Sequence, residues 1–341
     1  MSRFKSSLLR FYNWLKKFPV MCTLAVLVPV IIYATIYTFS PEFVYSNLYY
    51  TGVVFDVDPQ EFSITKINPL FKIMDISSFS NYQGGTCYED YYVLCSNNFE
   101  CLLIYNMNNH KVEHTIYTNM TNTDYHCNTI FFGPDFYSSI DKFPILYVSM
   151  ENEGVEATIA YRIYQDGGSY SISQVQKINL VCDEGTKIYL PNSYFDYSNN
   201  ILYYSGYTQN SYMKSDDNML KYYTFFLPDF RIAECDLNTK NAITSFELPS
   251  ETATQGGFIS DRYLFQTFSF NSETDPLRKP KMRIVDLEEE VIVYDEQDLG
   301  KYGVYDEFEN IAACHNGHLY GFGVKSLQVF DFEFTGDTSN G

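Results

Sequence analysis

The sequence predicts an all-β protein: a β-propeller of five to six four-stranded blades, preceded by a single N-terminal transmembrane helix. Three observations predict this class. Residues 42–341 are rich in Tyr, Phe, Ile and Val, are punctuated by Asn, Asp and Gly, and show no helical period of useful length. The same part of the chain contains an internal repeat of two β-hairpins. Residues 20–39, by contrast, carry no charge and follow a purely basic flank.

Residues 19–40 are predicted to form a transmembrane signal-anchor helix, because about 20 apolar residues match the hydrocarbon thickness of a bilayer. Residues 1–18 form a basic juxtamembrane segment with no acidic side chain; its basic residues are Arg3, Lys5, Arg10, Lys16 and Lys17. The positive-inside rule then places the N-terminus in the cytoplasm and the C-terminal domain in the periplasm or outside the cell. A cleaved signal peptide is disfavoured, because the apolar core is long and residues 39–42 offer no small-residue cleavage site. We expect a single-pass protein that contacts the lipid bilayer through residues 20–39.

The charge of the chain is divided unevenly. Its formal net charge is -19, but residues 42–341 hold 18 basic residues against 42 acidic ones, a net of -24. Binding to a phosphate backbone requires a basic surface, so nucleic acid is not expected as a partner.

The first hairpin of the repeat joins two strands through a tight polar turn. Its clearest copies are residues 83–93 and 255–265, which both begin Gln-Gly-Gly, and a weaker copy is residues 312–320. A second hairpin follows at residues 104–112 and 284–291, and similar segments occur at residues 234–240 and 329–332. An Asp or Asn at the end of the strand is expected to cap each turn. Two hairpins per repeat make four antiparallel strands, which are the blade of a propeller.

Blades are predicted to start near residues 84, 127, 192, 256 and 312, and the stretch 182–249 is long enough to contain a sixth. The last repeat has only about three strands. We therefore expect a strand from residues 52–67 to complete that blade and to close the ring. The propeller domain is predicted over residues 45–335, followed by a flexible tail at 336–341. A β-sandwich is the alternative all-β fold, but it does not predict the repeat.

The Gln-Gly-Gly units, residues 126–133 followed by 143–149, and the DLNTK segment at 236–240 resemble the TolB-like six-bladed propeller proteins of gut Bacteroidetes. This resemblance covers most of residues 45–334. It implies a propeller of the cell envelope, and it implies no particular activity, because many such proteins look like exported lipoproteins of unassigned function. Residues 254–256 also resemble the Thr-Gln-Gly element of the five-bladed glutaminyl cyclase family, but the rest of that family's pattern is missing.

Seven cysteines lie outside the predicted membrane segment, so an exported domain would keep at least one free thiol. Several lie in apolar, strand-like runs, where Cys behaves as a small buried hydrophobic residue. Cys95 and Cys101, at the two ends of a short hairpin, are predicted to be the pair that forms a disulfide if one exists.

Six polar residues are predicted to line a mouth of the central channel and to contact a ligand: Gln83, Asp124, His126, Asn128, Gln255 and His315. In an inner strand starting near residue 127, His126 and Asn128 would face the channel while Cys127 packs between blades. Neighbouring residues of a strand point to opposite faces, which disfavours a Cys127–His126 nucleophile.

His315 and His318 flank an Asn-Gly turn and would lie opposite each other across a hairpin. Such a pair can hold a metal with Asp124 or His126 as a third ligand. A surface hairpin with two polar residues explains the pattern equally simply and is favoured, so no metal and no cofactor is expected. The sequence contains no phosphate-binding loop, GxSxG or HExxH motif.

Two functions from different classes remain open. The favoured hypothesis is a membrane-anchored, exported propeller that binds a protein, peptide or glycan, or serves as a scaffold of the cell envelope. The alternative is a propeller enzyme, such as a hydrolase, lyase or cyclotransferase, with its site in the central channel. Fold alone does not separate them, since propellers host many functions.

Overall fold

A computed structural model describes residues 27–32, 48–55, 58, 61–73, 82–118, 126–152, 155–211, 215, 217–251, 253–268 and 279–335. Contacts divide the chain into two units: residues 49–135 with 142–341 form one, and residues 1–48 with 136–141 form the other. In the second unit, residues 27–32 are helical. The rest of the predicted anchor at 19–40, the basic segment at 1–18 and the tail at 336–341 lie outside the described residues. No helix within the described part is long and apolar enough to cross a membrane.

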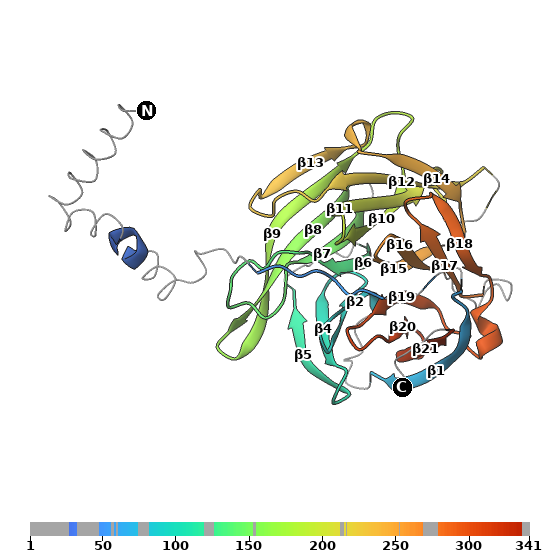
Figure 1. The fold of residues 1–341 in the computed structure, drawn as a ribbon, viewed down its shortest axis with the longest axis horizontal. Helices are drawn as coiled ribbons and strands as arrows, with labels where there is room; N and C mark the ends of the chain where they lie inside the picture. The colour runs from blue at the N-terminus through green and yellow to red at the C-terminus, as the bar shows by residue number, and fades with distance from the viewer. Residues whose placement is uncertain are drawn as a thin grey trace, which may run out of the picture. The chain divides into compact units, whose positions relative to one another are not determined.

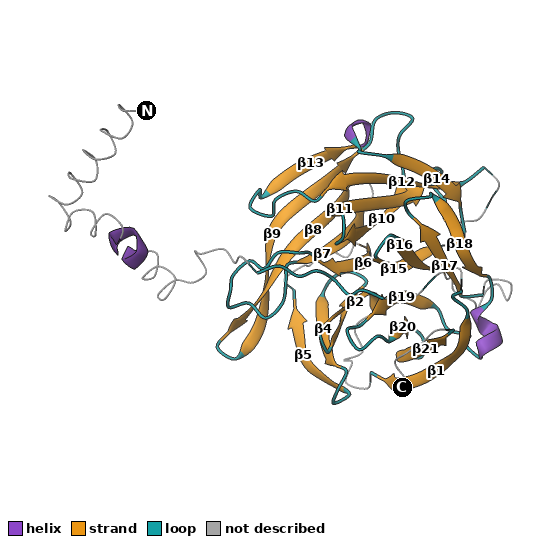
Figure 2. Cartoon of the chain, viewed as in Figure 1, coloured by secondary structure: helices purple, strands orange, loops and turns teal. Residues whose placement is uncertain are grey.

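The first unit is a propeller of five blades (Figure 1). Four blades are four-stranded sheets, and one has a fifth strand. Strands dominate it, and helical structure in its described part is limited to short 3-10 turns such as η2 (Thr239–Asn241) and η3 (Leu299–Tyr302) (Figure 2). In chain order the first two blades comprise β2 (Tyr82–Tyr88), β3 (Tyr91–Ser96), β4 (Cys101–Asn106) and β5 (Lys111–Tyr117), then β6 (His126–Phe132), β7 (Leu146–Asn152), β8 (Val155–Asp166) and β9 (Ser169–Val181).

The other three blades follow in the same way. Blade 3 comprises β10 (Tyr189–Asp196), β11 (Ile201–Tyr207), β12 (Met219–Phe226) and β14 (Ser245–Pro249). Blade 4 comprises β15 (Thr254–Ser260), β16 (Tyr263–Phe268), β17 (Lys281–Asp286) and β18 (Val291–Glu296). Blade 5 comprises β19 (Phe308–Ala313), β20 (Leu319–Gly323), β21 (Gln328–Phe334) and β1 (Ile64–Lys72). The propeller and its five predicted blade starts are thus confirmed.

The prediction of a sixth blade within residues 182–249 is wrong. Residues 189–249 form blade 3, because β12 pairs directly with β14. The segment 234–240, expected as a hairpin, instead gives β13 (Glu234–Asn238) and the turn η2. β13 pairs in parallel with β9 and becomes a fifth strand of blade 2. The edge of β9 offers a row of unpaired backbone groups, and β13 satisfies them.

The ring closes as the repeat predicts. β1 pairs antiparallel with β21 and supplies the outermost strand that blade 5 lacks. The strand begins at Ile64 rather than near residue 52, because residues 51–55 are not part of any strand. The predicted caps are also present: Asn106 Oδ1 accepts a bond from the Asn108 amide at 2.9 Å, and Asp286 Oδ1 from the Glu288 amide at 3.1 Å.

Blades pack on one another through buried aromatic and aliphatic side chains. Between blades 4 and 5, Phe265 and Ile284 lie in one cluster with Phe308 and Phe332. Between blades 5 and 1, Tyr92 and other side chains of the first blade pack against Phe322 and its neighbours. The high content of Tyr and Phe in this sequence therefore fills the wedges between blades.

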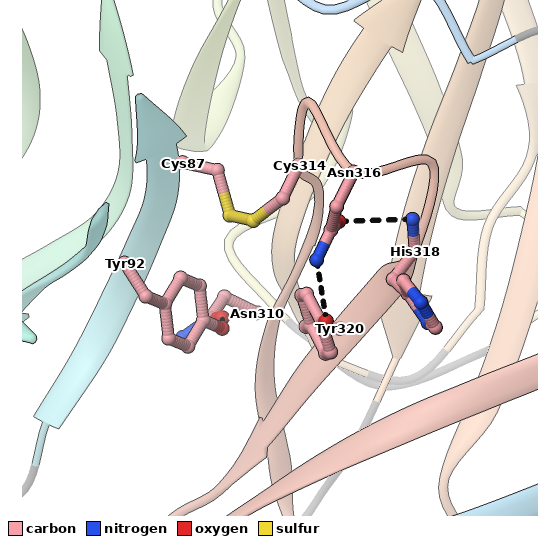
Figure 3. The surroundings of a disulfide bond; sticks show 7 residues. All are labelled: Cys87, Tyr92, Asn310, Cys314, Asn316, His318 and Tyr320. Atoms are coloured by element: carbon pink, nitrogen blue, oxygen red, sulfur yellow. Dashed lines mark hydrogen bonds between the residues drawn. A yellow bond between two sulfur atoms is a disulfide. The ribbon is translucent and has the colours of Figure 1, made fainter. Parts of the chain in front are cut away.

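The disulfide joins Cys87 of β2 to Cys314, which follows β19, with a Cα–Cα distance of 5.3 Å (Figure 3). It connects blade 1 to blade 5 at their inner strands. The predicted Cys95–Cys101 bridge is wrong, since both thiols are buried and neither forms a disulfide. Cys95 pairs across the hairpin with Leu102, so Cys101 points to the other face of the sheet.

We expect the double variant Cys87→Ser/Cys314→Ser to lose about 2–5 kcal/mol of unfolding free energy, since the bridge restrains a long loop of the unfolded chain. Urea denaturation of the full chain measures this loss as a lower midpoint. The control is Cys182→Ser, which removes a half-buried free thiol. A double variant that keeps the parent's midpoint would show that the bridge adds nothing to ring closure.

Candidate functional site

The inner strands β2, β6, β10, β15 and β19 form a ring in which each contacts the next. Each blade begins with its inner strand, so the five strands surround a central channel. Their first residues line a cavity at one end, and their last residues meet the segment 49–55 at the other. The two ends therefore have separate chemistries.

The segment 49–55 closes the end where the inner strands finish. The Tyr50 amide donates to the Pro134 carbonyl at 2.7 Å, and the Phe55 amide donates to Ser260 Oγ at 2.7 Å. The Tyr50 ring lies 5.1–6.0 Å from three other rings, those of Tyr88, Tyr197 and His315. Together these contacts reach the end of every inner strand. The space below the segment is about 30 Å³, which suits about one water molecule.

Every inner strand carries one extra residue near its beginning. From Tyr82 to Gly85, β2 advances three residues while β3 advances two, from Ser96 to Leu94. The same one-residue excess occurs in the other four, between residues 127 and 130, 189 and 192, 254 and 257, and 308 and 310. Such bulges redirect side chains. The first bulged residues are Gln83, Asn128, Leu190, Gln255 and Glu309.

The glycines after Gln83 and Gln255 are required by close approach of the inner strands. A Cβ on Gly256 would lie 2.5 Å from the Asn310 Cα, and one on Gly85 would lie 2.6 Å from the Asn310 side chain. Asn310 itself is fully buried; it donates to the Gln83 carbonyl at 2.7 Å and accepts from the Tyr92 hydroxyl. The repeated Gln-Gly-Gly thus directs a Gln toward the channel and leaves room for the neighbouring strand.

The cavity at the open end has a volume of about 440 Å³. Its wall is formed by the beginnings of the inner strands and by two residues of second strands: Gln83, His126, Asn128, Glu151, Leu190, Tyr207, Ala253, Thr254, Gln255 and Glu307. These described residues include two carboxylates and neither Lys nor Arg. We call this surface the mouth cavity.

Three buried side-chain oxygens near the mouth cavity have no hydrogen-bond partner among the described residues: Gln83 Oε1, Asn192 Oδ1 and Glu309 Oε2. Each of these side chains is at least nine-tenths buried; Glu309, for example, is 3% exposed. A buried polar atom without a partner is unfavourable by roughly 1–3 kcal/mol. The two amide oxygens are acceptors, and so is Glu309 when it is ionised, so a molecule that brings donors would remove this cost.

Burial raises the pKa values of the acidic groups around the cavity. Desolvation raises the pKa of Glu309 well above its ordinary value, and the nearby Glu307 and Asp306 add to the shift. Desolvation, with Glu156 as a second cause, raises the pKa of Glu151 to about 7. Burial lowers the pKa of His126, and its hydrogen bond to Asn128 opposes that shift. The cavity is therefore rich in acceptors and in carboxyl groups held near neutral charge.

Leu190 is the apolar member of the bulge set, and its φ of +54° is unfavourable for a branched side chain. It lines the mouth cavity beside the polar groups. Strained conformations of this kind persist where the surrounding structure requires them, often at binding sites.

Of the six residues predicted for a channel mouth, four come together: Gln83, His126, Asn128 and Gln255 all line the mouth cavity. Asp124 lies outside the described residues. His315 lies at the opposite, closed end beside Tyr50 and does not join them. Their role in ligand contact stays a prediction.

Four residues that line the cavity were missed by sequence reasoning, namely Glu151, Leu190, Tyr207 and Glu307. Glu309, which is buried two residues after Glu307, was missed as well. Glu151 and Tyr207 come from second strands, opposite the first residues of the inner strands. Glu309 occupies the same bulge position as Gln83 and Gln255, but no Gln-Gly-Gly marks it. Aligning the fifth repeat by its bulge rather than by its turn would have found it.

The nucleophile and metal alternatives find no support in the described residues. Cys127 is fully buried beside Cys95 of blade 1, and burial raises its pKa well above the ordinary value. His318 Nδ1 lies 3.1 Å from the Asp331 carboxylate, and its backbone amide donates to Asn316 in the turn shown in Figure 3. No group of three or more His, Cys, Asp or Glu side chains in the described ranges is placed to hold a metal ion.

No protein-family model and no curated protein matches the chain. Among solved structures, it is similar to the Myxococcus xanthus glutaminyl cyclase, with 9% identity, a TM-score of 0.47 and coverage of 80% of this chain and 96% of that one. The PQQ-bound aldose sugar dehydrogenase of Streptomyces coelicolor has 9% identity and a TM-score of 0.46, with coverage of 82% of this chain and 100% of that one. A glucose dehydrogenase has 9% identity and a TM-score of 0.43, with coverage of 78% of this chain and 98% of that one. Such distant similarity concerns the fold alone and assigns neither a family nor an activity.

The raised pKa of Glu151 predicts a pH dependence of stability. The folded state holds this proton more tightly than the unfolded chain, whose pKa is 4.5, so stability falls between about pH 4.5 and pH 7 as the buried group is forced to ionise. Glu151→Gln removes this loss and should be more stable than the parent by about 2 kcal/mol above pH 7, with no difference near pH 4. Urea midpoints across this range measure the effect.

Glu156 on β8, which faces Glu151, and His126 on β6 also titrate, so only the difference between parent and variant is diagnostic. The matched control is Glu184→Gln, which changes an exposed carboxylate. If both variants follow the parent's pH profile, the burial of Glu151 has no energetic consequence.

Proposed function

We propose that this chain is a membrane-tethered, extracytoplasmic binding protein whose propeller holds a polar ligand in the mouth cavity. The observation that carries the proposal is the set of buried, unpaired oxygens beside a cavity that opens at one end only. The cavity of about 440 Å³ suits a small molecule or the end of a peptide or glycan chain. A larger protein partner would present such a group from its surface.

The location is supported by two features. The Cys87–Cys314 bridge is of a kind that persists in oxidising compartments outside the cytoplasm. The basic segment and uncharged stretch of residues 1–40 fit an N-terminal anchor with the propeller outside. The finer hypothesis of a divergent TolB-like protein rests on the sequence resemblance, and the five blades depart from the six of that family.

A propeller enzyme acting in the same cavity is the second candidate. It is favoured by Glu151, whose pKa of about 7 suits a general acid or base at neutral pH. The variant Glu151→Gln separates the two candidates. It would abolish turnover of a substrate by Glu151, but it would retain the binding of a ligand that is not turned over.

Ligand-observed NMR with the detergent-solubilised full chain tests the proposal against amino acids, short peptides and oligosaccharides. We expect ligands whose binding is lost in Gln83→Leu, which removes a wall acceptor of the cavity. This variant should fold, since it replaces a buried atom that has no partner. Thr115→Leu, an exposed change on the outermost strand of blade 1, should retain binding.

The proposal fails if no compound of these classes binds in a manner sensitive to Gln83→Leu. Incubation of each bound compound with the parent protein and with Glu151→Gln then separates binding from catalysis. Conversion by the parent alone would favour the enzyme.

A further inference from the structure

The chemistry of the mouth cavity restricts the kind of ligand it can take. The unpaired atoms are oxygens of Gln83 on β2, Asn192 on β10 and Glu309 on β19. A turned amide can present its nitrogen instead, but both terminal atoms of Glu309 are oxygens. When ionised, Glu309 only accepts hydrogen bonds, so a ligand that binds its carboxylate form must bring donors.

Glu251 shows how this chain treats a buried carboxylate that has a structural role. It is 1% exposed, and it lies 2.7 Å from Lys281 Nζ and 3.4 Å from Arg283 Nη2. Its charge is compensated by two cations from β17. The site thus satisfies the rule that buried charges are paired.

Glu309 is as deeply buried and has no such cation in the described part of the chain. Its charged neighbours are Glu307 and Asp306, and the nearest compensation in this group is Lys325, which acts on Glu307. On the far side of the cavity, Lys187 acts on Glu156. Desolvation, with Glu307 and Asp306 as further causes, raises the pKa of Glu309, so in the absence of a cation its protonated form is favoured. An arriving cation would replace that proton.

The cavity suits an organic cation better than a metal ion. Its volume of about 440 Å³ far exceeds one ion, and Leu190, Ala253 and Tyr207 supply apolar wall for a hydrocarbon stem. The described residues contain no cluster of three metal-ligating side chains. A primary ammonium has three donors and no acceptor, which complements a carboxylate and an unpaired amide oxygen such as Gln83 Oε1.

We infer that the ligand carries a primary ammonium group on a short apolar stem, with the ammonium received by Glu309 and by the amide oxygen of Gln83. This inference rests on the proposed function, because it names the chemical class of ligand for the same cavity. A free peptide N-terminus and an alkylamine or polyamine share this chemistry.

Titration calorimetry or NMR with the full chain at pH 7.5 tests it with four probes: butylamine, 1,4-diaminobutane, tri-alanine amide, and the same peptide N-acetylated. We expect at least one free amine to bind. Acetylation, or Glu309→Gln, should weaken binding at least about tenfold, since a charge-assisted bond is lost. Glu309→Gln keeps the shape of the side chain, and Glu184→Gln is the control that should retain affinity. Comparing the peptide with the two alkylamines identifies the source of the ammonium.

Two results would overturn the inference while sparing the proposed function. One is a neutral ligand, such as the acetylated peptide or an oligosaccharide, that binds as tightly as any amine and is sensitive to Gln83→Leu. The other is stoichiometric binding of calcium that depends on Glu309 and excludes the amines. If no probe, charged or neutral, binds in a manner sensitive to Gln83→Leu, both the inference and the proposed function fail.

Discussion

The pairing of β1 with β21 closes the propeller, and much of the rest of the molecule follows from it. A ring of blades is stable only when the last blade is complete and meets the first. Because β1 is the outermost strand of blade 5, the chain that precedes it has to reach that position from elsewhere. The described residues 49–55 do so across the ends of the inner strands, where Tyr50 and Phe55 are buried. Closure of the ring and closure of one end of the channel are thus consequences of one connection, and the Cys87–Cys314 bridge reinforces the same junction.

The open end owes its character to a second constraint, the bulge shared by the five inner strands. The bulge places one side chain at the same level of each inner strand. The five residues at this position are two Gln, one Asn, one Leu and one Glu. The backbone of the ring is fixed by packing at positions such as Asn310 and Gly256. Four of the five bulge residues are at least nine-tenths buried, and their chemistry differs from strand to strand. Unpaired acceptors at these positions lower stability, which makes a compensating ligand the simplest reason for them.

Local sequence patterns predicted the fold well and predicted the site in part. The hairpin repeat located all five inner strands, and Gln-Gly-Gly pointed to Gln83 and Gln255, since both the bulge and the close strand approach are local. Long-range features escaped prediction. The pairing of Cys87 with Cys314 depends on which blades are neighbours in the closed ring, and β13 joins β9 through an edge that no pattern near residue 234 reveals. Glu309 escaped because its bulge has no glycine to mark it, and Glu151 because it belongs to a second strand. Whether residues 19–40 span a membrane stays a prediction.

The central claim is that the channel opens at one end only, into an acceptor-rich mouth. Thiol modification tests this most directly. In a protein with Cys182 and Cys235 replaced by Ser, one new thiol is introduced, either by Gln255→Cys at the mouth or by Ala312→Cys below the segment 49–55. We predict that a trimethylammonium methanethiosulfonate reagent modifies the thiol of Gln255→Cys at least about tenfold faster than that of Ala312→Cys. At a pH above about 8, where Glu151 is ionised, it should also react faster there than a sulfonate reagent, because the wall has carboxylates and, among the described residues, neither Lys nor Arg. Equal rates at the two positions would contradict a one-ended channel. A preference for the sulfonate reagent at the mouth would contradict its acidic character.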